Sequence, residues 1–99
     1  MELGVEKDKS VTDFLGRLEL AADLTMVQFV DYWDADLCAI GVKRENRLVY
    51  ISTFNLEYKY YYELELLDEN EVDKYTVLQR GDDVAENVLI SVVKEFLNI

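Results

Sequence analysis

EYKYYYELEL, the segment from Glu57 to Leu66, decides the fold of this 99-residue chain. Its side chains alternate with a period of two, which is typical of a β-strand with one buried face and one solvated face. We therefore predict a central strand over 58–66. One parity consists of Tyr58, Tyr60, Tyr62, Leu64 and Leu66, and the other of Lys59, Tyr61, Glu63 and Glu65. Three buried tyrosine hydroxyls would each need a hydrogen-bond partner, so the pattern leaves open which parity faces the core.

The flanking residues predict further strands in the same sheet. Apolar, aromatic and β-branched residues recur with a period of two between Met26 and Phe54, and such residues favour strands. Asp34, Asp36 and Asn46 fall between these segments and suit tight connections. Because strands joined by short connections are antiparallel neighbours, we predict a meander. The predicted strands are 26–33, 37–43, 48–54 and 58–66, with a short fifth strand over 75–78.

A helix is predicted ahead of the sheet. Ser10 and Asp13 are spaced like the two residues of a capping box. The apolar residues after Ser10 share one face at helical spacing, as in an amphipathic helix of about three turns. Residues 1–9 show no period and are predicted to be a loose lead-in. The apolar face comprises Val11, Phe14, Leu15, Leu18, Ala21 and Ala22.

A second helix is predicted at the C-terminal end. Asp83 and Glu86 repeat the capping spacing ahead of a wide apolar arc. Many residues of this arc are β-branched, so a strand over 88–93 is the alternative to the helix. Two terminal helices that cover one face of the sheet would make 1–99 a single α+β domain, a two-layer sandwich. The other face of the sheet would then be exposed or used for binding.

The net charge disfavours several classes of function. Twenty-one acidic residues against ten basic ones give a formal charge of −11. Nucleic acids and anionic membranes would be repelled, whereas a basic protein partner would be attracted. Alternatively, the acidity only keeps a small protein soluble. No apolar run approaches the roughly 20 residues of a membrane span, and the N-terminus lacks the pattern of a signal peptide, so we expect a cytoplasmic protein.

The sequence offers little catalytic chemistry. It contains no histidine and one cysteine, Cys38. This excludes an internal disulfide, disfavours a cysteine-based zinc site and removes the commonest general base. Cys38 is interpreted as a small buried hydrophobe, with a reactive thiol as the alternative. The carboxylate pairs at 34/36, 68/69 and 82/83 suit a turn, a solvated loop and a helix cap better than catalysis or metal binding. We expect no enzyme activity, cofactor or metal.

A binding surface is the remaining hypothesis. Acidic residues crowd the strand over 58–66 and the loop after it, and tyrosines are interleaved with them. Tyrosine and tryptophan are frequent interface anchors, and carboxylates beside them can pair with basic residues of a partner. Alternatively, the aromatic residues belong to the core and the acids only solvate a loop. The candidate partner-binding residues are Tyr61, Glu63, Glu65, Asp68, Glu69, Glu71, Asp73, Trp33, Asp34 and Asp36.

The general character of the chain resembles the small acidic immunity proteins of bacterial contact-dependent growth inhibition and related polymorphic toxin systems. The resemblance rests on the segment RLVYIST (47–53), the Tyr-rich acidic strand and GDDV (81–84) ahead of the C-terminal helix. It implies a tight complex with a cognate toxin domain, often a nuclease, whose basic cleft or a neighbouring exosite is blocked by steric and electrostatic occlusion.

Two other functions remain open. One is a phage-type acidic DNA mimic that inhibits a host nucleic-acid enzyme. The other is a structural or adaptor domain that dimerises through an exposed strand edge. We expect either a monomer or a weak homodimer.

Overall fold

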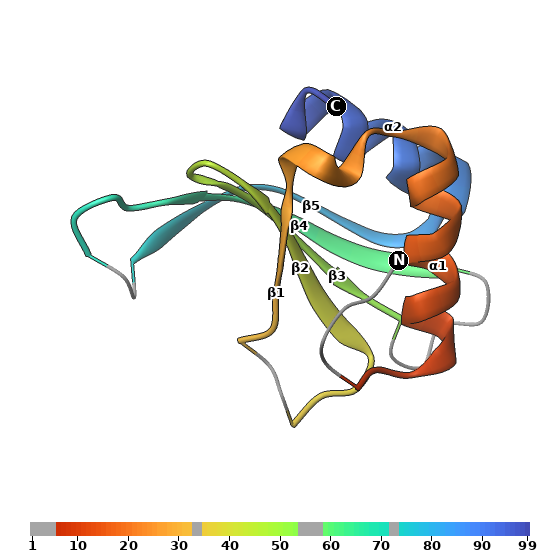
Figure 1. Cartoon of the computed structure of the whole chain (residues 1–99). Helices are drawn as coiled ribbons and strands as arrows, with labels where there is room; N and C mark the ends of the chain where they lie inside the picture. The colour runs from red at the N-terminus through yellow and green to blue at the C-terminus, as the bar shows by residue number, and fades with distance from the viewer. Residues whose placement is uncertain (1–5, 33–34, 54–58, 72–73) are drawn as a thin grey trace.

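The protein folds into an open five-stranded antiparallel sheet with a helix at each end of the chain (Figure 1). The computed structural model describes residues 6–32, 35–53, 59–71 and 74–99. The strands lie in the order β1-β2-β3-β4-β5, so each pairs with its neighbour in sequence. This confirms the predicted α+β fold and its meander. The elements are α1 (Lys9–Ala21), a 3₁₀ turn η1 (Leu24–Met26), β1 (Gln28–Val30), β2 (Ala39–Arg44), β3 (Arg47–Ser52), β4 (Lys59–Leu67), β5 (Tyr75–Ala85) and α2 (Glu86–Leu97).

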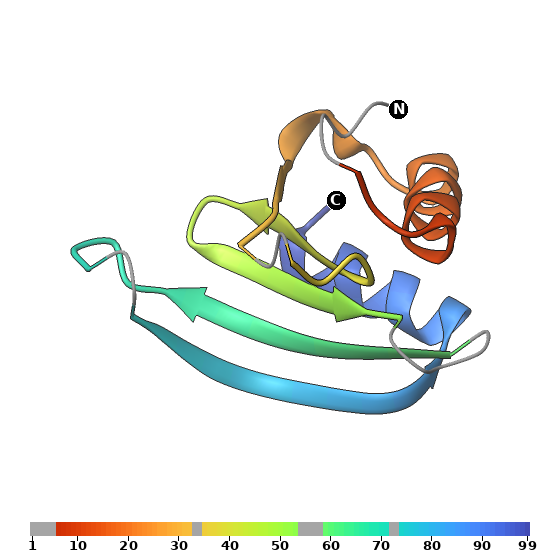
Figure 2. The same cartoon turned by 90° about the horizontal axis from the view of Figure 1, so that it is seen from below.

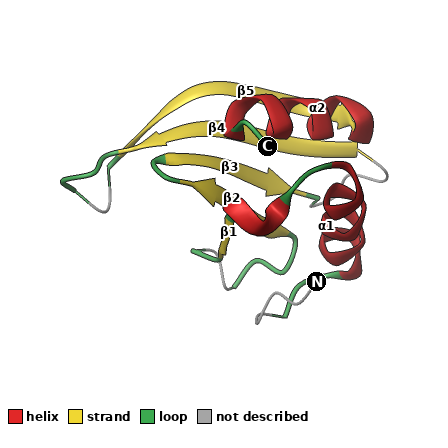
Figure 3. Cartoon of the chain, turned by 45° about the horizontal axis from the view of Figure 1, so that its top comes forward, coloured by secondary structure: helices red, strands yellow, loops and turns green. Residues whose placement is uncertain are grey.

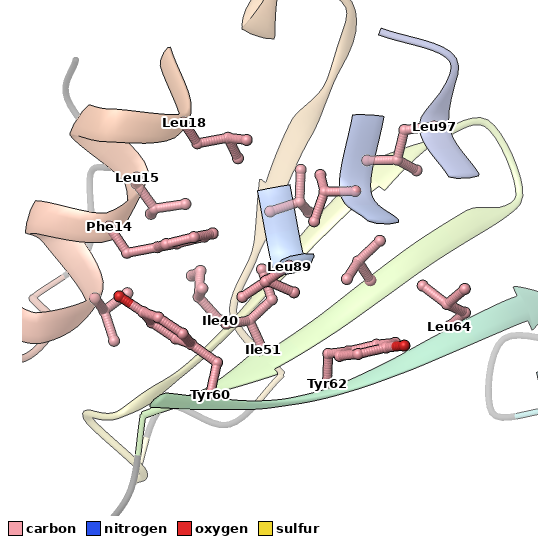
Figure 4. Packing of buried hydrophobic residues seen from close by; sticks show 14 residues of the cluster. Phe14, Leu15, Leu18, Ile40, Ile51, Tyr60, Tyr62, Leu64, Leu89 and Leu97 are labelled. Carbon is pink, nitrogen blue, oxygen red and sulfur yellow. The ribbon is translucent and has the colours of Figure 1, made fainter. Parts of the chain in front are cut away.

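The core lies between the sheet and the two helices (Figures 2, 3 and 4). Helix α1 contributes the four residues that its spacing predicted, Val11, Phe14, Leu15 and Leu18, all buried. Ala21 is exposed and Ala22 half-buried, so the buried face ends one turn earlier than predicted. Helix α2 confirms the helical prediction over 88–93. Its buried residues are Leu89, Val93 and Leu97.

The tyrosine parity of β4 faces the helices, so the alternative that it faces outward is wrong. Tyr60 and Tyr62 belong to the core cluster (Figure 4). Each hydroxyl has the partner that burial requires: Tyr60 Oη donates to Glu86 Oε1 at 2.7 Å, and Tyr62 Oη accepts from Gln79 Nε2 at 2.7 Å. Tyr58 lies outside the described residues.

Two residues of β4 differ in burial from the predicted alternation. Leu66, predicted to face inward, is 38 % exposed, and Glu65 is only 4 % exposed. The register with β3 is regular through Leu66, so Glu65 stays on the same face as Glu63, whereas the pairing with β5 shifts register between Leu64 and Glu65.

In the described part of the N-terminal lead-in, polar contacts hold Lys7 and Asp8, and Lys9 is already the first residue of α1. Lys7 is buried, pairs with Asp31 at 2.7 Å and donates to the carbonyl of Asp36 at 2.9 Å. The residue that caps α1 is Asp8, not Ser10, because its carboxylate accepts the Ser10 N–H at 3.0 Å. Positions 1–5 of the lead-in lie outside the described residues.

The first strand is shorter than predicted. Within the described residues 26–32, the 3₁₀ turn ends at Met26 and the strand comprises Gln28–Val30. The turn at the start of this range is stabilised by Asp23, whose carboxylate accepts the Thr25 N–H at 3.0 Å.

The fifth strand is much longer than predicted, and it displaces the predicted helix cap. Strand β5 continues through Gly81 to Ala85 because it pairs with β4 along its length, with register shifts. Asp83 lies in this strand with φ of 54° and caps no helix. Glu86 is the first helical residue, and its carboxylate pairs with Arg17 of α1 at 2.8 Å. The pairing of β5 with β4 therefore overrides the local capping pattern at Asp83.

Two arginines tie the end of α2 to the hairpin between β2 and β3. Arg44 donates to the carbonyls of Leu97 and Asn98 at 3.0 and 2.7 Å, and Arg47 donates to the carbonyl of Phe96 at 2.9 Å. Cations at these carbonyls satisfy groups that the helix leaves open and oppose its dipole.

Gly81 is required by the close packing of Tyr62 on β5. A Cβ at this position would lie 2.1 Å from Cε1 of the Tyr62 ring. We expect Gly81→Ala to lower the free energy of unfolding in urea by about 1–3 kcal/mol, because the buried ring must move. Gly16→Ala is the control, since a Cβ there meets nothing within 4 Å and alanine favours a helix by about 0.5–1 kcal/mol. A Gly81→Ala protein as stable as the wild type would contradict this packing.

Candidate functional site

The candidate site lies on the outer face, which we define as the side of the sheet opposite α1 and α2. Because Tyr60, Tyr62 and Leu64 pack under the helices, the residues between them point the other way. Strand pairing places Tyr50 of β3 and Arg80 of β5 on either side of Glu63. The outer-face cluster consists of Tyr50, Tyr61, Glu63, Glu65 and Arg80.

Glu63 is the centre of this cluster. The Tyr61 hydroxyl donates to Glu63 Oε2, and Arg80 Nε lies 3.5 Å from the same oxygen. The bond to Glu63 is the main reason that the pKa of Tyr61 rises to about 12. The rings of Tyr50 and Tyr61 meet edge to face, with centroids 6.1 Å apart. A carboxylate, a guanidinium and two phenols are therefore held together on the side of the sheet opposite the helices.

Glu65 is the unusual member of the cluster. Its register partner on β3, Leu48, is 1 % exposed, and Glu65 itself is 4 % exposed. Burial is the largest of the causes that raise the pKa of the Glu65 carboxyl to about 7, and the hydrogen bond and charge of Glu63 contribute to the same rise. The cluster therefore holds one carboxyl that changes its charge near neutral pH.

The predicted acidic loop forms the tip of the hairpin between β4 and β5. Figures 1 and 2 show this hairpin reaching away from the body of the protein. Asp68, Glu69 and Glu71 are exposed there. Asp68 Oδ1 accepts the Asn70 N–H at 2.8 Å, and Glu71 pairs with Lys74 at 2.7 Å. Asp73 lies outside the described residues.

The other predicted site residues do not join the outer-face cluster in the described part of the chain. Asp36 stabilises the turn in which it lies. Its carboxylate accepts the Cys38 N–H at 3.0 Å, and its backbone carbonyl accepts a hydrogen bond from Lys7 Nζ. Trp33 and Asp34 lie outside the described residues. Cys38 is a free, half-buried thiol.

Tyr50 and Arg80 are the members of the cluster that the sequence did not predict. Alternation in RLVYIST placed Tyr50 on one face of its strand, but the register that brings it opposite Glu63 follows only from the folded sheet. Arg80 lies beyond the predicted fifth strand over 75–78 but within β5.

Three pockets that described residues line lie at the hairpin stem and around the C-terminal end of α2. Within residues 6–32, 35–53, 59–71 and 74–99, no group of three or more Cys, Asp or Glu side chains is placed to hold a metal. The helices described there are all too short or too polar to cross a membrane.

Comparisons with protein-family models, with curated proteins and with solved structures find no match to this chain.

Proposed function

We propose that this protein is an immunity-type inhibitor that binds a basic toxin domain, such as a nuclease, and blocks it by steric and electrostatic occlusion. The observation that carries the proposal is the outer-face cluster, which lies on the side of the sheet that neither helix covers. It joins tyrosines, which are typical interface anchors, to carboxylates that can pair with basic residues.

The hairpin tip extends this surface. Strand β4 runs from the cluster directly to Asp68, Glu69 and Glu71, so a partner that lies along its second half meets Glu63 and then the carboxylates of the hairpin tip. A net charge of −11 adds a long-range attraction for a basic protein. Binding would need no covalent step, since covering the toxin's cleft or an exosite is enough to inhibit it.

The direct test is co-expression with toxin nuclease domains from bacterial contact-dependent systems. We expect the chain to restore growth against its cognate toxin and to form a one-to-one complex with it. Capture of several unrelated DNA-binding proteins instead would favour the DNA-mimic alternative, because phosphate-like spacing of acids would serve many partners.

The hairpin tip gives a sharper prediction for the complex. Glu69 is exposed, so Glu69→Lys should not disturb the fold, but it reverses a charge on the proposed surface. We expect the association rate with the toxin to fall about tenfold at low salt, and the difference to shrink as salt is added. Stopped-flow measurement of the association rate checks this.

Glu95→Lys is the matched control, because it makes the same change of charge on the exposed side of α2, in the helix layer. Its association rate should stay within about twofold of the wild type, since only the overall field changes. Equal loss in both variants would show that net charge, and not the proposed surface, guides association.

A second candidate function is a module that dimerises through β5. This strand forms one edge of the sheet and is 11 residues long, with most of its side chains exposed. Edge strands of this kind can pair with a second copy. A stable dimer of the isolated protein in light scattering would favour this function over the inhibitor.

A further inference from the structure

We propose that the stem of the β4–β5 hairpin is the apolar anchor point of the partner interface, and that a basic protein covers it with a bulky apolar side chain flanked by lysine or arginine. We define the hairpin stem as Leu66, Leu67, Tyr75, Thr76 and Leu78. This inference deepens the proposed function and rests on it for the partner, but the contact itself can be tested without a toxin.

The hairpin stem leaves large apolar side chains in contact with water. Tyr75 is 56 % exposed, Leu78 is 54 % exposed, and Leu66 is exposed beside them. The register places Leu67 opposite Tyr75, so these two side chains are cross-strand neighbours. Single apolar side chains on a surface are normal, whereas a group of them marks a contact site.

A pocket opens on the hairpin stem. Its volume is about 450 Å³, which falls within the usual range of binding pockets and leaves room for a bulky side chain. Its walls combine apolar side chains of the stem with one carboxylate and one ammonium. The residues that line it are Leu66, Leu67, Asp68, Lys74, Tyr75 and Thr76.

The edge of the sheet is unprotected along this stem. Strand β5 forms one edge of the sheet, and its residues 75–79 (YTVLQ) carry no charge. Exposed edges commonly carry lysine, other charges or proline, because an uncharged apolar edge invites association. Leu78 has no register partner on β4, and such an irregularity interrupts the row of backbone groups that an added strand would need. The stem therefore suits the side chains of a partner better than an added strand.

Charge favours a basic partner over a second copy of the chain. Among the described residues 68–71 and 74, three exposed carboxylates accompany one ammonium, that of Lys74, which pairs with Glu71. A second copy would bring the same excess of acid and a further net charge of −11, so like charges would oppose the contact. A partner that surrounds its apolar side chain with lysine or arginine is attracted to the same place.

The hairpin stem lies between the outer-face cluster and the hairpin tip (Figures 1 and 2). Leu67 has the same parity as Glu63 along β4, so it lies on the outer face, and its register partner Tyr75 shares that face. An apolar centre within a polar rim is the usual arrangement of an interface, and tyrosine is frequent among the residues that carry most of the binding energy. We therefore expect Tyr75 to be the main anchor.

An NMR titration of the whole chain with short peptides tests the contact. The probe is a blocked heptapeptide in which leucine and lysine alternate, and the reference peptide has serine in place of leucine. We expect the leucine peptide to bind about tenfold more tightly, with its largest amide shifts at residues 64–71 and 74–80. A tenfold difference corresponds to about 1.4 kcal/mol, which the burial of about 55 Å² of apolar surface supplies. A peptide that alternates leucine with glutamate should show no binding, because its charge is repelled.

Substitution of Tyr75 tests the anchor. The side chain is more than half exposed, so Tyr75→Ser should leave the fold intact. We expect it to reduce the advantage of the leucine peptide from about tenfold to about threefold or less. Leu20→Ser is the matched control, because Leu20 is a still more exposed apolar side chain on α1. It should keep the tenfold advantage.

Equal binding of the leucine and serine peptides to the wild type would overturn the proposal, as would a Tyr75→Ser protein that keeps the tenfold difference. Should Tyr75→Ser fail to fold, the wild-type titration decides, since shifts centred away from the hairpin contradict the site. A dimer of the isolated protein that Tyr75→Ser dissociates would show that a second copy, and not a basic partner, covers the stem. These measurements involve no toxin, so a chain that neutralises none would count against the proposed function and leave their result standing.

Discussion

Phe14→Ala should lower the free energy of unfolding by about 3–5 kcal/mol, the usual cost of removing a buried aromatic ring. Phe14 is fully buried on α1, and its ring lies 4.9 Å from that of Tyr60 on β4. The alanine would leave a cavity where the helix meets the sheet, and both the lost burial and the empty volume destabilise the fold. Urea unfolding followed by circular dichroism gives the value.

Leu20→Ala on the same helix is the control. Leu20 is 88 % exposed, so its truncation should change stability by less than about 0.5 kcal/mol. A loss below about 1 kcal/mol in Phe14→Ala would mean that α1 is not held on the sheet by this contact.

Asp31→Ala should cost a similar amount, about 3–5 kcal/mol, for an electrostatic reason. The side chain of Lys7 is fully buried, and its ammonium lies 2.7 Å from Asp31 Oδ1. Removing the carboxylate takes one negative charge away from a buried ammonium, which is costly in a low-dielectric interior. The free energy of unfolding from urea titration, measured at neutral pH, tests the expectation.

Asp13→Ala is the matched control, since Asp13 also pairs with a lysine at 2.7 Å, but on the surface. Exposed pairs contribute about 0–1 kcal/mol, so this variant should remain close to the wild type. The double substitution Lys7→Met with Asp31→Leu should recover much of the loss, because it removes both charges together. If the double variant is as unstable as Asp31→Ala, the loss comes from packing and not from the buried charge.

Periodicity predicted those parts of the fold that depend on one element at a time. The spacing of apolar residues within a single element predicts three features: the four buried residues of α1, the strand over 58–66 and the helix over 86–97. The predictions were wrong where pairing with another segment of the chain determines the structure. Asp83 has the spacing of a helix cap, yet pairing with β4 carries β5 past it to Ala85.

The candidate site shows the same division. Tyr61, Glu63 and Glu65 could be placed on one face from their alternation alone. The burial of Glu65 could not, because it depends on the neighbouring strands, where the buried Leu48 is its register partner on β3. The recruitment of Tyr50 and Arg80 likewise depends on register, which a single strand does not encode.

The meander order has a consequence for how the chain folds. Every strand pairs with its sequence neighbour, so each hairpin can form by closing a short loop, and low contact order favours rapid folding. The helices differ, because α1 and α2 stand at opposite ends of the chain and the Arg17–Glu86 pair spans 69 positions. We expect the hairpins to form in the transition state and the two helices to dock on the sheet afterwards, so that Phe14→Ala speeds unfolding far more than it slows folding.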